Sequence, residues 1–210
     1  MPRATVALAA AILLVSLVQF RGAVLVGDGP FDVRELARSI FTVDRPALLP
    51  VVILAVLVVG GLAERVIGSG RLLVAYLAGG LTTSVAGLVI GAVESAFLPG
   101  LPLNSEVFTG APPVAALLVV AMTASGFVGA LWRRRVRWAS AVIAVTLFLY
   151  SASASDLYTL IALPVGLALG VVLGGRPVTL RVPRSSHHET RVLLAALTAV
   201  TAVGPMIATV

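Results

Sequence analysis

The side chains that could hold a metal ion or a reacting group are few, and most lie near the end of the chain. The stretch "SSHHET" at 185–190 brings together His187, His188 and Glu189. Adjacent residues of a helix point about 100° apart, so the two histidines would not share a ligand face as residues i and i+4 do. The spacing of Ser186 and Glu189 instead fits a capping box at a helix start. The chain has no cysteine, which removes thiolate chemistry, disulfides and cysteine-ligated metals. We predict no metal site and no cofactor.

Arginine is the charged side chain that occurs in groups along the sequence. The chain carries 15 basic residues and a net charge of +6, but only 11% of its residues are charged and its mean hydropathy is +1.09. Soluble domains carry about 25% charged residues. The composition therefore predicts an integral membrane protein of the cell membrane, and we expect no nucleic-acid partner. In such a protein, arginines between apolar runs set the orientation of the helices.

The densest group is "WRRRVRW", in which tryptophans flank four arginines. Anionic lipid headgroups would be attracted to these residues by about 1 kcal/mol per arginine. A role in orientation alone is the alternative, and the two roles are compatible. The possible headgroup ligands are Arg133, Arg134, Arg135 and Arg137.

Apolar runs long enough to span a bilayer must position these groups, since a spanning helix needs about 20 mostly apolar residues. We expect an all-α, polytopic helix bundle with seven spans. They are predicted at 4–20, 47–63, 71–93, 112–132, 138–155, 157–175 and 191–210. The arginine-rich loops place the N-terminus in the cytoplasm. The first span could instead be a cleaved signal peptide. Between the first two spans, "FDVRELARSIF" fits a short amphipathic helix on the outer surface, with a solvated loop as the alternative.

The turn between the second and third predicted spans is short, charged and rich in glycine. Its sequence, "GGLAERVIGSGRLLVAYLAGG", runs from 60 to 80. Pairing of Glu64 with Arg65 or Arg71 would close a tight hairpin at the inner face, and we expect this to be structural rather than a proton relay. The residues that define the hairpin are Gly60, Glu64, Arg65, Gly68, Arg71 and Tyr76.

This hairpin pattern resembles the rhomboid intramembrane proteases, whose second helix ends in Gly-x-x-Leu-Glu and continues Gly-Ser-x-Arg before a Tyr in the third. The sixth predicted span adds Gly166, Gly170 and Gly174, and the resemblance places a glycine repeat in that helix. Small residues at every fourth position give a smooth face for helix packing. The resemblance implies a six-helix rhomboid-like domain at 1–184, here followed by a linker and final helix at 185–210.

The catalytic residues that the resemblance implies are missing. The second-helix positions that would stabilise an oxyanion hold Leu48 and Val52. At the start of the fourth span, Pro112-Pro113 replaces Ser-Gly, and no histidine stands near 162–164. Ser125, in "TASG", lies about a dozen residues into that span, and we expect it to pack between helices. The resemblance therefore implies a rhomboid-like fold without protease chemistry, and no catalytic residue.

A second, shorter resemblance concerns "SSHHETRVLLAALTAVTAVGP". It is similar to the segment that follows the membrane domain in actinobacterial phosphatidylglycerol lysyltransferase-type proteins, which modify lipids through a soluble domain. The functions that remain open are a non-catalytic protein that binds or scaffolds lipid or a partner membrane helix, and the membrane module of such an aminoacyl-phosphatidylglycerol synthase. A small transporter is disfavoured, because the predicted spans lack buried ionisable pairs.

Overall fold

A computed structural model describes residues 3–20, 33–43, 46–97, 111–151 and 154–174. Every regular element among these residues is helical. With the segments from Pro46 to Ile67 counted as one broken helix, they form a bundle of seven helices without a strand. The predicted all-α class is thus confirmed for the described part of the chain. The final predicted span, at 191–210, and the histidines at 187 and 188 lie outside it.

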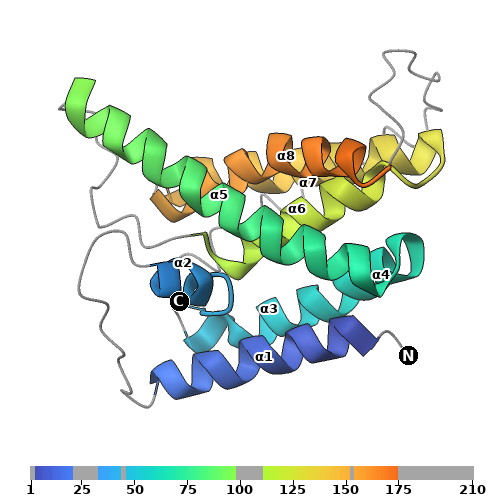
Figure 1. The fold of residues 1–210 in the computed structure, drawn as a ribbon, viewed down its shortest axis with the longest axis horizontal. Helices are drawn as coiled ribbons and strands as arrows, with labels where there is room; N and C mark the ends of the chain where they lie inside the picture. The colour runs from blue at the N-terminus through green and yellow to red at the C-terminus, as the bar shows by residue number, and fades with distance from the viewer. Residues whose placement is uncertain (1–2, 21–32, 44–45, 98–110, 152–153, 175–210) are drawn as a thin grey trace.

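The first half of the chain contributes four helices, shown from blue to green in Figure 1. They are α1 (Arg3–Phe20), the short α2 (Val33–Ser39), a long broken helix and α5 (Ser69–Phe97). The broken helix runs through η1 (Pro46–Leu48), α3 (Leu49–Ala55), the π-helical turn η2 (Val56–Gly60) and α4 (Gly61–Ile67). A short helix is present as α2 within the stretch where the sequence predicted one.

The second half contributes α6 (Pro113–Ser125), α7 (Ala130–Ser151) and α8 (Ala154–Val172). Here the predicted boundaries are wrong. The fourth span was expected at 112–132, but α6 ends at Ser125, and a turn through Gly126 and Gly129 leads into α7. The sequence "WRRRVRW" therefore lies in the first turns of a helix and not in a loop.

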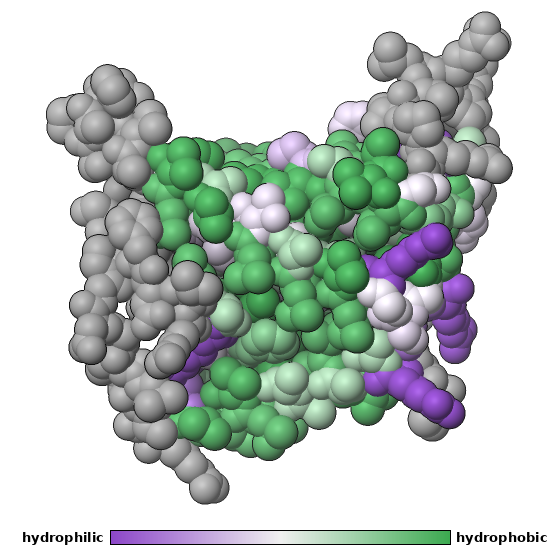
Figure 2. All heavy atoms as spheres, viewed as in Figure 1, coloured by the Kyte–Doolittle hydropathy of each residue, from purple (hydrophilic) through white to green (hydrophobic). Residues whose placement is uncertain are grey.

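Among the residues that the structure describes, three helical stretches are long and apolar enough to cross a membrane, whereas the sequence predicted seven spans, one of them outside these residues. The three stretches are Arg3–Phe20, Pro46–Ile67 and Ser69–Ile90. Two further apolar helices are shorter, at Pro113–Ser125 and Asp156–Val172. Large apolar side chains cover the outside of the described bundle, as Figure 2 shows for one face. Leu14, Leu54 and Leu62 each expose about 60% of their surface. Such an apolar exterior is what a lipid environment selects.

Helix α6 forms the centre of the bundle and contacts α5, α7, α8 and the broken helix. Nearly all of its side chains are buried. Glycines let α8 approach it closely: a Cβ on Gly166 would stand 2.7 Å from the Val119 carbonyl oxygen, and one on Gly170 would stand 3.3 Å from that of Thr123. Gly174, the third glycine of the repeat, has a φ of 89° and lies just beyond the end of α8. It does not pack against α6, since nothing lies within 4 Å of its Cβ position.

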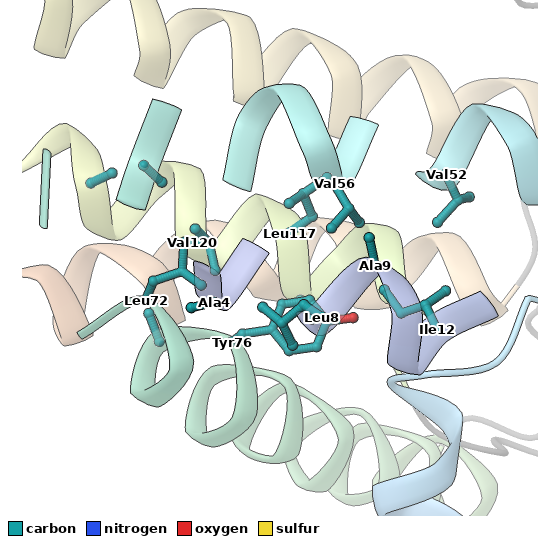
Figure 3. Packing of buried hydrophobic residues seen from close by; sticks show 14 of the residues in the cluster. Ala4, Leu8, Ala9, Ile12, Val52, Val56, Leu72, Tyr76, Leu117 and Val120 are labelled. Atoms are coloured by element: carbon teal, nitrogen blue, oxygen red, sulfur yellow. The ribbon is translucent and has the colours of Figure 1, made fainter. Parts of the chain in front are cut away.

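An apolar cluster joins α1 to the broken helix, α5 and α6. Figure 3 shows Leu8 and Ile12 of α1 beside Tyr76 of α5 and Val56 of the π-helical turn. The Tyr76 hydroxyl donates a hydrogen bond of 2.6 Å to the carbonyl oxygen of Ile40, just after α2. The same tyrosine therefore ties α2 to the bundle.

Candidate functional site

One end of the bundle collects most of the described arginines. The N-terminus of α1, the turn between α4 and α5, the turn between α6 and α7, and the end of α8 all lie at this end, on the right of Figure 1. Hydrophilic side chains gather at the same end in Figure 2. We call this region the arginine end. Its arginines are Arg3, Arg65, Arg71, Arg133, Arg134, Arg135 and Arg137.

A single buried carboxylate organises the α1 side of this end. Glu64, 8% exposed, accepts hydrogen bonds from the backbone N–H groups of Ala4 (3.1 Å) and Thr5 (2.9 Å). The hydroxyls of Thr5 (2.7 Å) and Ser69 (2.6 Å) also donate to it. The first N–H groups of a helix have no partner within the helix, so Glu64 caps α1 from a distant part of the chain.

The predicted partners of Glu64 are wrong. We expected Arg65 or Arg71 to pair with it, but both arginines are exposed and the carboxylate's hydrogen bonds come from α1 and Ser69. Two backbone N–H groups and two hydroxyls already supply four hydrogen bonds, which fills the two carboxylate oxygens. Sequence spacing could not reveal Thr5, which stands 59 residues away. The sequence feature that could have pointed to this pairing was a threonine within an otherwise apolar helix.

Glycine makes the α4–α5 turn possible. Gly68 has a φ of 83°, a value that L side chains rarely adopt, and α5 begins at the next residue. On the preceding helix, Gly60 brings the π-helical turn close to α1, because its Cβ would stand 3.1 Å from Cγ2 of Thr5. The tight hairpin that the sequence suggested is therefore held by Gly68 and by Glu64, and its arginines remain available for other contacts.

The α6–α7 turn is surrounded by three arginines. Arg71, from α5, lies 5.3 Å from the ring centroid of Phe127. Arg133 donates from Nη2 to the carbonyl oxygen of Val128 (3.3 Å). Arg137 donates from Nε to the hydroxyl of Ser125 (3.0 Å). Each guanidinium is thereby fixed by one contact to the residues of the turn or its edge.

Arg133 and Arg137 influence each other. Burial, with the nearby positive charge of Arg133, lowers the pKa of Arg137 from its usual value. An arginine stays protonated in proteins all the same. The two guanidiniums therefore repel each other, and an anion placed between them would relieve that repulsion. Of the other predicted headgroup ligands, Arg135 lies 5.2 Å from the ring centroid of Trp132, and Arg134 is half-buried.

Ser125 is the last residue of α6 and is almost fully buried. Its hydroxyl donates to the carbonyl oxygen of Met122 (2.6 Å) and accepts from Arg137. The hydroxyl thus links the central helix to the arginine of α7.

The positions that would carry rhomboid catalysis hold apolar residues in the fold as well. Val52 and Ala162 are buried in the apolar core, and Leu48 packs against it. Ala111 precedes α6, and its backbone N–H donates to the hydroxyl of Ser84 (2.9 Å). No side chain at these positions carries a nucleophile or a base.

The described residues contain no group of three acidic or histidine side chains that could hold a metal ion. Glu106 and the sequence 185–190 lie outside the described residues, and so does the side chain of Glu94.

Comparison with known proteins gives this chain no relative: no family model, curated protein or solved structure matches it.

Proposed function

We propose that this chain is a non-catalytic, rhomboid-like integral membrane protein that binds anionic lipid at its arginine end. One observation carries the proposal. Seven arginines stand at that end, and Glu64, the acidic residue beside them in the described structure, uses its oxygens to cap α1. Glu64 therefore does not neutralise these arginines, and headgroups of an anionic leaflet would meet their charge.

The rhomboid-like part of the proposal is supported by the layout of the elements. A glycine turn joins two spanning helices beside a buried glutamate, a short helix follows the first span, and a glycine-bearing helix packs on the central one. The absence of catalytic chemistry is proposed from the apolar residues at 48, 52 and 162 and from Pro112. We also propose that the arginine end and the N-terminus face the cytoplasm, because arginines are enriched on the cytoplasmic side of membrane proteins.

Binding of a partner membrane helix stays a second possibility for the apolar exterior. The role as a membrane module of an aminoacyl-phosphatidylglycerol synthase rests on the sequence 185–205, outside the described residues. Both would use the same membrane-embedded bundle, and both are compatible with lipid contact at the arginine end.

Native mass spectrometry of the chain purified with its lipid tests the proposal. Changing Arg133, Arg134, Arg135 and Arg137 to Gln should lower the affinity for anionic phospholipid by about a thousandfold, at about 1 kcal/mol per arginine. A matched control removes the same charge from the segment between the first two predicted spans, by changing Arg21, Arg34, Arg38 and Arg45 to Gln. The control should keep its lipid. Equal retention by both variants would refute the proposal, provided that circular dichroism and gel filtration show both to be folded.

A further inference from the structure

We propose that Arg71, Arg133 and Arg137 form a discrete site, around the turn at 126–129, for the phosphodiester of one anionic phospholipid. This inference rests on the proposed lipid contact and narrows it. General attraction needs only positive charge near a membrane surface. A discrete site needs donors held in fixed positions, and the contacts at this turn provide them.

Arg133 is the central member of the site. Its side chain is only 9% exposed, and its Nε is buried without a hydrogen-bond partner. Burying an unpaired donor of a charged group is costly, so such a group in a native protein calls for an acceptor. The Nη2 contact with Val128 anchors the guanidinium at the turn and leaves its other donors for a ligand.

Arg137 supplies the second set of donors. Its Nε is engaged with Ser125, which orients the guanidinium while leaving the two terminal nitrogens. Because Arg133 and Arg137 stand close enough to repel each other, the two together favour an anion over an empty site. A phosphodiester offers two charged oxygens, which match the fork-shaped donors of arginine.

Arg71 closes the site from α5. Its guanidinium lies against Phe127, at 5.3 Å from the ring centroid, on the residue next to the one that Arg133 contacts. The ring holds the cation by a cation–π interaction and an apolar surface. Phe127 also marks where the apolar part of a lipid would meet the polar end. A phosphate with an attached acyl chain therefore fits this corner better than a free phosphate.

The sharpest test replaces arginine by lysine, which keeps the positive charge but removes the paired N–H donors of the guanidinium. Lysine retains the positive charge of arginine but cannot form the bidentate contact. Three variants are compared in detergent: R133K, R137K and, as a control outside the arginine end, R38K in α2. The probes are dioctanoyl phosphatidylglycerol, dioctanoyl phosphatidylcholine and glycerol 3-phosphate, titrated with native mass spectrometry and tryptophan fluorescence as readouts.

We expect the wild-type chain to prefer phosphatidylglycerol over phosphatidylcholine, and R133K and R137K to lose about tenfold in affinity for it. R38K should bind as the wild type does. Equal binding by all three variants would overturn the discrete site and leave the proposed function standing, because diffuse attraction depends on charge alone. Equally tight binding of glycerol 3-phosphate would overturn the lipid as the source of the phosphate. The proposed function itself would be refuted by a different result: equal lipid retention by the fourfold Gln variant and its control. A thermal melt of each variant separates lost binding from lost folding.

Discussion

Replacing Glu64 by Gln would remove the charge of the carboxylate that joins α1 to the α4–α5 turn while keeping the size of the side chain. One carboxylate oxygen accepts from the Ala4 N–H and the Ser69 hydroxyl, and the other accepts from the N–H and hydroxyl of Thr5. The amide nitrogen of Gln must replace one of the two oxygens. The facing hydroxyl can rotate and accept, but the facing backbone N–H cannot.

Either orientation of the Gln side chain therefore leaves one buried N–H of α1 without an acceptor. Such a group costs about 1–3 kcal/mol, and the hydrogen bonds that remain lose their charge assistance, at roughly 1 kcal/mol each. We expect E64Q to lower the free energy of unfolding by about 3–5 kcal/mol.

Unfolding by sodium dodecyl sulfate in mixed micelles measures the loss, and hydrogen exchange locates it at the amides of residues 4 and 5. The matched control is D156N, which makes the same change of acid to amide in the first turn of α8. Asp156 is half-buried, and an acid near a helix N-terminus contributes about 0.3–2 kcal/mol, so the control should change less. The reasoning is refuted if E64Q unfolds like the wild type and both amides keep their protection.

Two further predictions concern packing and a buried hydrogen bond. G166A should destabilise the chain by about 1–3 kcal/mol in the same unfolding assay, because the added methyl group would meet the Val119 carbonyl oxygen at 2.7 Å and push α8 from α6. G70A, where nothing lies within 4 Å, should be neutral or stabilising, and a comparable loss there would argue against the packing explanation. Y76F should cost about 1–2 kcal/mol and increase hydrogen exchange around residue 40, because the Ile40 carbonyl oxygen loses its donor. Unchanged exchange in Y76F would show that this bond does not hold α2.

The sequence predicted the helical membrane class and the hairpin because both depend on local composition. The apolar runs and the Gly68-Ser69 pair are visible without any three-dimensional knowledge, and α5 begins where that pair suggests. The pairing of Glu64 was beyond such reasoning. Its partners come from α1, and which distant helix approaches a given residue is decided by packing of the whole bundle. Thr5 and Gly60 meet at that approach, but nothing in their spacing indicates it.

The boundary of α6 shows a different limit. The run from 112 to 132 stays apolar through the turn, so hydropathy alone continues the helix across it. Gly126 and Gly129 were the available signals, but glycine is tolerated within membrane helices and does not by itself mark an end. The consequence was to assign the arginines of α7 to a loop. Because they lie four residues apart on a helix, Arg133 and Arg137 both reach the α6–α7 turn.

The shortness of α6 has a consequence for membrane thickness. Thirteen residues give a helix of about 20 Å, while the hydrocarbon core of a bilayer is about 30 Å thick. With its Ser125 end at the arginine surface, the other end of α6 would stop roughly 10 Å below the opposite surface. Few backbone N–H groups are left unpaired at that depth, because Pro112 and Pro113 have none and the N–H of Ala111 donates to the Ser84 hydroxyl. A bilayer that matched the length of α6 would be locally thin here, and water would come nearer to the central helix.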